Sequence, residues 1–249
     1  SNTQGSGTGW YQTKAFKYGA YGASSDGTVL KSVSGATRYA NITRETARTQ
    51  AMANGTGYYQ RDLYAGTILM FLWWIEFATK NSWSIMTGYL GSAAIPTGGT
   101  DNLGFSNGYN PTGGQMIWHG IEDFYGNVLE WEDGITGYGV QYVSDDYTKY
   151  NDTGTGMNTL AFNIPTTFGD NLIAIGWDSS NPFLAQPIET SLDNNYTTGF
   201  CSFASTSNGA CAYRGSVWSG GASNGVSYFG RSNANWAKAF IGCRLLKTV

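Results

Sequence analysis

The chain has 249 residues, a formal net charge of −3 and only 12% charged residues, with no cluster of Lys and Arg. This balance provides no electrostatic footprint for nucleic acid, and the longest apolar run, Ile68 to Ile75, is far too short to cross a bilayer. Its 35 glycines and 15% aromatic residues, without a collagen-like period, are typical of a loop-rich globular domain.

Two helices are predicted after an opening stretch of about 35 residues in which glycine and aromatic residues alternate, a pattern typical of a strand or two with turns. Thr43 is the expected N-cap of the first helix, with Glu45 in its first turn and Asn54-Gly55 at its end. The second helix is predicted from Asp62 to about Thr79 and, being apolar all round in its middle, is expected to be mostly buried. The residues expected to share one of its faces are Leu69, Leu72, Trp73 and Glu76.

From Ser82 onward, short apolar pieces lie between clusters of Gly, Asn, Asp and Ser, which indicates strands and long irregular loops. Two helices followed by such a remainder predict an α+β fold in a single domain, residues 1–249, with an N-terminal strand and loop segment at 1–40. Three cysteines do not make a disulfide scaffold. Cys201 and Cys211 lie near enough to pair across a short loop, but we expect reduced thiols, with Cys243 single.

Four stretches carry a resemblance to a known family. They are "WWIEFA" (Trp73–Ala78), "GIEDFYGNVLEWEDG" (Gly120–Gly134), "YRGS" (Tyr213–Ser216) and "IGCRLL" (Ile241–Leu246). In this order they resemble the formylglycine-generating-enzyme/sulfatase-modifying-factor family, which implies a C-type-lectin-like fold rich in irregular loops. The chain departs from the family pattern at Leu129, Ser216 and Cys243, where Trp, Gly and Phe are expected.

The residues of these motifs also have a structural interpretation. Trp131 and Val128 are expected core anchors, and Asn127 after Gly126 suits a tight turn. Charges inside a fold must be paired. The pairs expected here join Arg214 and Arg244 to Glu130 or Glu76.

The residues that catalysis requires in this family have no counterpart. Its oxidising members use two cysteines just downstream of the R-G-G-S motif, whereas Arg214 to Gly242 contains none, and a multi-histidine iron site cannot form around His119 alone. No nucleophile elbow accompanies His119, which is expected to pack on or hydrogen-bond near Trp118. We therefore predict no enzyme and no cofactor. Ser144–Gly154 and Gly176–Asn181 offer oxygen ligands for calcium, but without EF-hand spacing.

The C-terminal segment 212–247 is rich in Gly, Ser, Asn and aromatic residues. It resembles the variable region of proteins diversified by retroelements, a group that includes phage tail receptor-binding proteins. In such regions asparagine codons are copied with errors at adenines within a fixed frame. That frame would be Arg214, Gly215, Trp218, Gly221, Gly225 and Ile241–Arg244. The predicted ligand-binding positions are Ser216, Val217, Ser219, Gly220, Ser223, Ser227, Tyr228, Gly230, Arg231, Ser232, Trp236 and Phe240, of which Trp236 would derive from a lysine codon.

Such residues are typical of adaptable recognition surfaces, because aromatic rings supply contact area and small polar groups supply hydrogen bonds. We predict a non-enzymatic protein that binds a host-cell surface receptor, either protein or glycan, from a virion tail or a cell surface after synthesis in the cytoplasm. Neither nucleic acid nor membrane insertion is expected, and a homo-oligomer is left open. The alternatives are an enzyme with an unfamiliar site near His119 and a structural virion protein. The residues expected on one exposed face, with Trp218 turned inward, are Ser219, Ser223, Ser227, Tyr228, Arg231 and Ser232.

Overall fold

The structure is a computed structural model that describes residues 14–105, 107–110, 114–137, 139–162, 171–182, 184–191, 201–203, 210–221 and 225–249. In this part of the chain two α-helices accompany many short, mostly antiparallel strands, so the predicted α+β class is confirmed. The helices are α1 (Arg44–Met52) and α2 (Leu63–Phe77), and the single-turn 3-10 helices are η1 (Ser82–Ser84), η2 (Asp101–Leu103) and η3 (Tyr147–Lys149). None of the described helices is long and apolar enough to cross a membrane.

Helix α1 begins where its sequence predicts. The side chain of Thr43, in an extended backbone conformation, accepts a hydrogen bond from the amide of Thr46, and Glu45 lies in the first turn. Ala47 and Ala51 are one turn apart and face the core with no exposed surface.

Helix α2 also begins as predicted, at its N-cap Asp62, and it ends at Ala78, which has a left-handed backbone with φ of 49°. The expectation that it is mostly buried is wrong for its second half. Trp73 is fully buried, but Leu72 and Ile75 are 48% and 76% exposed. A run that is apolar on every side has no periodicity to tell which face turns inward.

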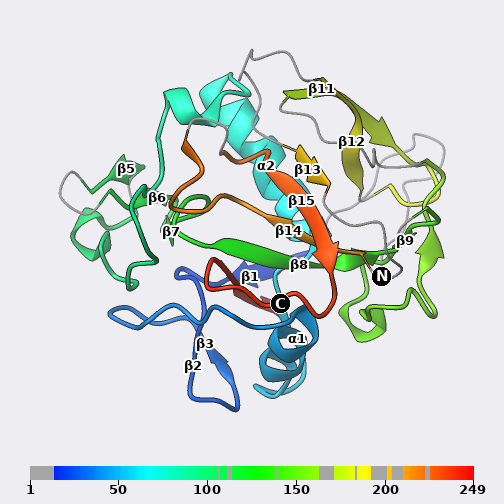
Figure 1. The fold of residues 1–249 in the computed structure, drawn as a ribbon, viewed down its shortest axis with the longest axis horizontal. Helices are drawn as coiled ribbons and strands as arrows, with labels where there is room; N and C mark the ends of the chain where they lie inside the picture. The colour runs from blue at the N-terminus through cyan, green and yellow to red at the C-terminus, as the bar shows by residue number, and fades with distance from the viewer. Residues whose placement is uncertain are drawn as a thin grey trace.

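A central seven-stranded sheet crosses the middle of the molecule (Figure 1). In spatial order its strands are β10 (Asn158–Thr159), β9 (Tyr142–Val143), β8 (Leu129–Thr136), β14 (Ala210–Arg214), β15 (Phe229–Asn233) and β13 (Cys201–Phe203), with β16 (Ile241–Gly242) paired to β8. Strand β15 therefore lies between β14, which is antiparallel to it, and β13, which is parallel.

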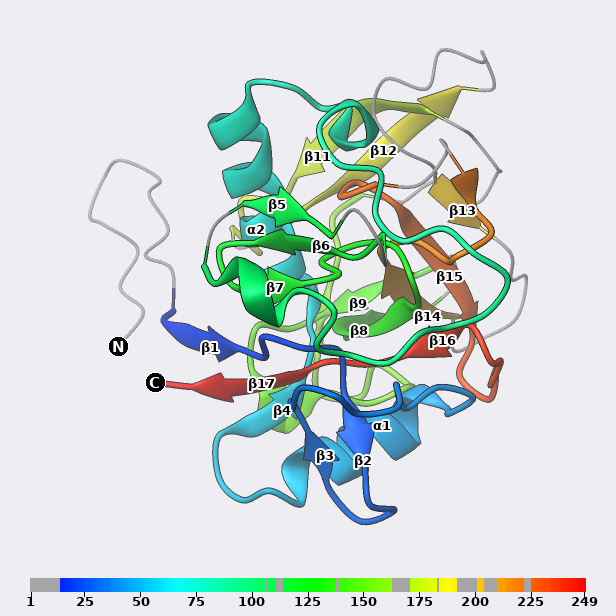
Figure 2. The same ribbon diagram turned by 90° about the vertical axis from the view of Figure 1, so that its left-hand side faces the viewer.

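Smaller sheets surround the central one. The strands β1 (Phe16–Tyr18) and β17 (Leu245–Thr248) lie side by side, although they are far apart in sequence, and β4 (Tyr58–Gln60) completes their sheet (Figure 2). The other strands are β2 (Ser24–Ser25), β3 (Leu30–Lys31), β5 (Gly108–Tyr109), β6 (Met116–Trp118), β7 (Ile121–Glu122), β11 (Asn171–Trp177) and β12 (Ala185–Ser191).

Strand β8 is buried along its whole length and presents different chemistry on its two faces. On one face Trp131 is fully buried among aromatic rings, and its indole N–H donates to the carbonyl of Ile42. On the other face the carboxylates of Glu130 and Glu132 meet buried arginines. The expected core role of Trp131 is confirmed, and that of Val128, which is 4% exposed, is confirmed with it.

The buried arginine pairs are close to expectation but not identical to it. Arg244 contacts Glu130 at 2.8 Å, as predicted, and Arg61 contacts the same carboxylate at 2.8 Å. Arg214 instead pairs with Glu132 at 2.8 Å, because side chains two residues apart on β8 share one face. Burial alone would raise the pKa of Glu130, but the neighbouring arginines outweigh it and hold that pKa below its usual value.

Candidate ligand-binding surface

Backbone hydrogen bonds fix the start of the C-terminal segment. The amide of Trp218 donates to the carbonyl of Asn127 at 3.1 Å, and the carbonyl of Trp218 accepts from the amide of Gly91 at 2.9 Å. Asn127 has a φ of 66°, which confirms the tight turn predicted after Gly126. The amide of Gly220 donates to the carbonyl of Val217 and closes a turn that projects the segment outward.

The end of the segment is fixed in the same way. The carbonyl of Lys238 accepts from the amides of Asn41 and Ile241 at 2.9 and 3.0 Å, and the carbonyl of Phe240 accepts from the amide of Leu129 at 3.0 Å. Strand β16 begins only at Ile241, because Ala239 and Phe240 belong to this turn.

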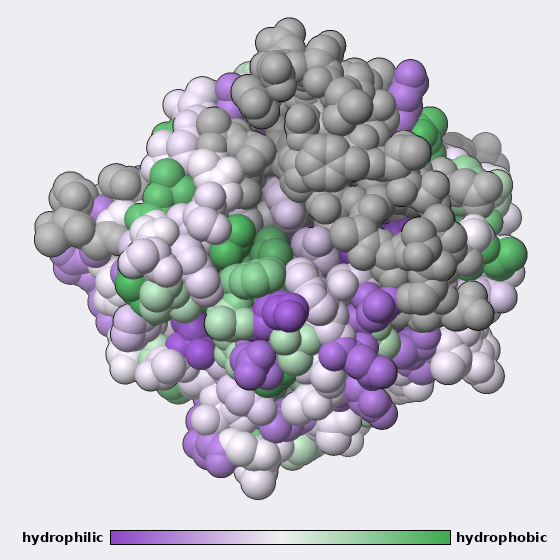
Figure 3. Space-filling view, in the orientation of Figure 1, coloured by the Kyte–Doolittle hydropathy of each residue, from purple (hydrophilic) through white to green (hydrophobic). Residues whose placement is uncertain are grey.

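Between these anchors lies a surface that we call the aromatic patch, formed by the partly exposed side chains of Val217, Trp218, Trp236 and Phe240. The rings of Trp236 and Phe240 are 5.4 Å apart, and those of Trp218 and Phe240 are 6.4 Å apart, both edge to face. Beneath them Trp236 contacts the buried ring of Tyr213 at 5.6 Å. In Figure 3, apolar and polar side chains lie intermixed near the centre of the face that presents this segment.

The predicted positions divide into two groups by exposure. Ser219 is exposed, and Val217, Gly220, Trp236 and Phe240 are partly exposed. The buried positions are Ser216, Ser227, Tyr228, Gly230, Arg231 and Ser232. Ser223 lies outside the described residues.

The expectation that Ser227, Tyr228, Arg231 and Ser232 lie on an exposed face is therefore wrong, since they are 2%, 8%, 2% and 7% exposed. Arg231 and Ser232 are buried because β15 is an interior strand, with β14 on one side and β13 on the other. Ser227 and Tyr228 come just before this strand, and the ring of Tyr228 stacks on the buried ring of Tyr213.

Gly230 is constrained even more tightly. A Cβ atom at this position would lie 2.3 Å from the ring of Tyr213, which leaves no space for a side chain. Variation at Gly230 would therefore displace a core aromatic residue. Trp218, in contrast, was expected to point inward and is partly exposed.

The surface also contains residues that the sequence did not single out. Asn233, Asn235, Lys238 and Ala239 are exposed in the stretch between β15 and β16, which borders Trp236 and Phe240. Ser232, Asn233 and Asn235 are residue types typical of turns and were the signal present in the sequence.

The described cysteine side chains are unreactive in character. Cys211 and Cys243 are buried, and the side chain of Cys201 lies outside the description. Burial raises the pKa of the Cys211 thiol to about 12 and that of Cys243 still further. A thiol that stays protonated at neutral pH is a poor nucleophile.

His119, the centre of the enzymatic alternative, is 60% exposed and packs its ring against Trp118 at 5.3 Å, as predicted. Its Nε2 lies 2.8 Å from Glu76, which also accepts from the indole of Trp118. Glu76 is therefore occupied here and does not pair with an arginine. Among the described residues, the His119 ring is hydrogen-bonded to the side chain of Glu76 and to no hydroxyl or thiol.

The two acidic segments considered for calcium have their carboxylates engaged by donors. Asp152 contacts Arg44 and Arg48, and Asp145 contacts Lys14. Asp178 accepts hydrogen bonds from backbone amides and a neighbouring asparagine. Within the described ranges no group of three or more His, Cys, Asp or Glu side chains is arranged to hold a metal ion.

No protein-family model matches the chain, and no curated protein matches it. The proposal below therefore depends on the geometry of this surface.

Proposed function

We propose that the chain is a non-enzymatic binding protein of C-type-lectin-like fold that recognises a host-cell surface receptor, protein or glycan, through the aromatic patch and the exposed turns beside it. Two helices, short strands and long irregular connections support this fold. For such receptor recognition the chain would be located on a virion tail or on the outside of a cell.

The observation that carries the proposal is how the patch is held. Hydrogen bonds between backbone atoms fix its segment at both ends. At one end Trp218 donates to Asn127 and accepts from Gly91, and at the other the turn at 238–240 accepts from Asn41 and Leu129. Backbone hydrogen bonds do not depend on which side chain a residue carries. A surface held in this way can change its side chains without losing its shape.

Composition supports the same function. Partly exposed tryptophan and phenylalanine rings supply contact area at a low cost in side-chain entropy, and the adjacent Ser219 and Asn235 supply hydrogen-bonding groups. Variation would be concentrated at the exposed positions. The buried positions of β15 would act as part of the scaffold.

The enzymatic alternative has less support. The described thiols are buried and resist ionisation. The ring of His119 has a carboxylate as its side-chain partner, and no nucleophile from the described residues is hydrogen-bonded to it. A carboxylate and an imidazole need a third reacting group to perform nucleophilic catalysis.

Two matched libraries displayed on cells would test the proposal. Each recodes an equal number of positions with the residues that an asparagine codon can reach. The exposed library changes Val217, Ser219, Gly220, Trp236 and Phe240. The buried library changes Ser216, Ser227, Gly230, Arg231 and Ser232.

Folding is measured as the fraction of clones resistant to protease. Buried changes at about 1–3 kcal/mol each can remove the whole stability of a domain, about 5–15 kcal/mol, whereas changes at exposed or partly exposed positions cost about 1 kcal/mol or less each. We expect most exposed-library clones to fold and most buried-library clones to unfold. Binders to unrelated proteins or glycans should then be selected from the exposed library. Equal loss of folding in both libraries, or a folded exposed library without binders, would contradict the proposal.

A further inference from the structure

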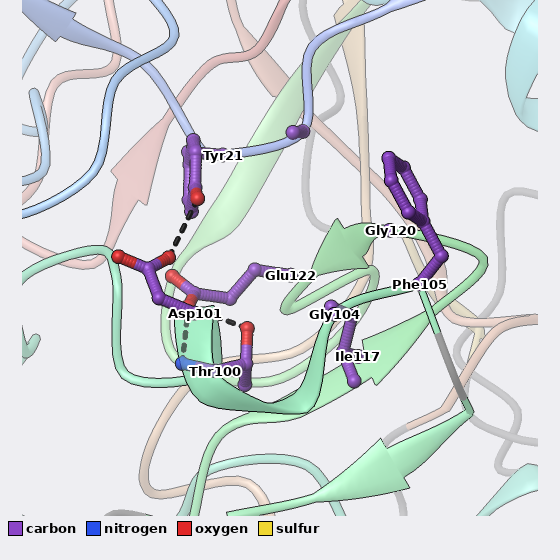
Figure 4. Close-up of a pocket in the computed structure, with 9 residues that line it drawn as sticks. Tyr21, Thr100, Asp101, Gly104, Phe105, Ile117, Gly120 and Glu122 are labelled. Atoms are coloured by element: carbon purple, nitrogen blue, oxygen red, sulfur yellow. Dashed lines mark hydrogen bonds between the residues drawn. The ribbon is translucent and has the colours of Figure 1, made fainter.

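A separate pocket of about 210 Å³ lies near the strands β6 and β7, away from the aromatic patch. Its walls come from the loop that follows β1, from η2 and the residues after it, and from the hairpin of β6 and β7. Figure 4 shows Tyr21 and Asp101 on one side of the pocket and Phe105 on the other, with Glu122 between them.

One side of the pocket is an oriented carboxylate. The hydroxyl of Tyr21 donates to Oδ1 of Asp101 at 2.6 Å, and the hydroxyl of Ser34 donates to Oδ2. These hydrogen bonds lower the pKa of Asp101, so it carries a negative charge at neutral pH. Each carboxylate oxygen keeps a further lone pair for a ligand, because an ionised carboxylate offers about four acceptor sites.

A second negative charge lies in the wall. Glu122 is 1% exposed, and its oxygens accept from the amides of Gly98 and Thr100, the hydroxyl of Thr100 and the side chain of Gln115. All of these donors are neutral groups, so they satisfy its hydrogen bonds without forming an ion pair. No Lys, Arg or His is among the residues that line the pocket.

The opposite side is apolar and aromatic. Phe105 is 85% exposed, and its ring rests against Gly120, where a Cβ atom would come within 2.5 Å of it. Ile117 continues the apolar wall. An exposed ring opposite a carboxylate offers both an apolar contact and a negative π face to a cation.

We propose that this pocket binds a primary alkylammonium group of the size of a lysine side chain. The ammonium would donate hydrogen bonds to Asp101 in the field of Glu122, and the methylene chain would lie along Ile117 and Phe105. The volume suits such a group: at about 30 Å³ for each water-sized unit it holds roughly seven, whereas drug-sized ligands need about 300 Å³ or more.

Nuclear magnetic resonance titration of the whole chain at low salt would test this. The probes are Nα-acetyl-lysine methylamide and n-butylammonium, with 1-butanol as the neutral isostere, butyrate as the anion and methyl glucoside as a polyol. We expect the two cations to bind saturably with millimolar dissociation constants, and we expect no binding of butanol or butyrate. Tighter binding of the lysine probe than of butylammonium would indicate a protein lysine as the natural source, and equal binding a free amine.

Two variants locate the site. Asp101→Asn keeps the shape and removes the charge, and it should weaken the lysine probe about tenfold. Phe105→Ala changes a mostly exposed side chain, should not affect folding, and should weaken the probe about threefold. Asp26→Asn, an exposed carboxylate that also accepts from a threonine hydroxyl, is the matched control and should bind as the parent does.

Three results would overturn the proposal. They are no saturable cation binding, equal binding of butanol or methyl glucoside, and unchanged binding by both Asp101→Asn and Phe105→Ala. Because Phe105→Ala should fold normally, it keeps the test decisive even if Asp101→Asn disturbs the contacts with Ser34 and Tyr21.

Discussion

The carboxyl group of Asp62, at the start of α2, should make the stability of the protein depend on pH. It is 2% exposed and accepts hydrogen bonds from the amide of Ala65 at 2.8 Å and the hydroxyl of Tyr150 at 2.6 Å. Burial raises its pKa from 3.8 to about 7, and the negative charges of Glu132 and Asp133 add to the rise, although the two hydrogen bonds oppose it. The folded state therefore holds this proton more tightly than the unfolded chain.

A folded-state pKa above the unfolded value sets the sign of the effect. The contribution of Asp62 to stability is fully present below about pH 4 and is lost as the pH rises to about 7. At about 1.36 kcal/mol for each pKa unit, a rise from 3.8 to about 7 corresponds to roughly 4 kcal/mol. Asp101, Asp146 and Asp152 have lowered pKa values, so their contributions are lost only on acidification and fall in a lower pH range.

The perturbation is Asp62→Asn, which stays neutral at every pH and keeps a side-chain oxygen to cap α2. Urea unfolding between about pH 5 and about pH 8 should show the parent losing stability and the variant losing less by roughly 2.6 kcal/mol, because the rest of the effect falls below pH 5. Asp146→Asn, at the N-cap of η3, is the control and should leave this pH range unchanged. Parallel stability curves for Asp62→Asn and the parent would refute the reasoning.

The remaining predictions concern packing and buried charge. Trp131→Ala should lower the free energy of unfolding by about 3–5 kcal/mol, because its site is fully buried. Trp218→Ala, at a partly exposed site, should lower it by about 1 kcal/mol. Equal losses in urea unfolding would be inconsistent with the different burial of the two residues. Arg214→Ala removes the closer of the two arginine partners of buried Glu132 and leaves Arg61 at 3.7 Å, so it should cost about 3 kcal/mol, against less than about 1 kcal/mol for Lys31→Ala in an exposed pair. Thermal melts that fail to separate these two variants would count against the buried pair.

The features that sequence predicted correctly are local. The cap of α1 at Thr43, the start of α2 at Asp62 and the turn at Asn127 each depend on a few neighbouring residues with known backbone preferences. The class of the fold followed from the same local patterns. The pairing of Arg244 with Glu130 followed from a general rule, that a buried charge needs a partner.

The features it missed depend on contacts between distant strands. The burial of Arg231 and Ser232 results from the position of β15 between β14 and β13, which no local pattern of small polar residues reveals. The same holds for Gly230, whose lack of space results from Tyr213 on the neighbouring strand. Of the candidate site, the sequence located the segment but could not separate its exposed side chains from its buried ones.

The two-faced strand β8 has a consequence for how mutations combine. Its aromatic face, with Trp131, supports the surface that we propose to vary, and its carboxylate face, with Glu130 and Glu132, belongs to the arginine network. Free-energy effects of substitutions add when the residues share no partners and couple when they do. Epistasis should therefore be strong within each face and weak across the strand. Substitutions in the surface that we propose to vary would then have little effect on the arginine network, which could stay almost unchanged during evolution.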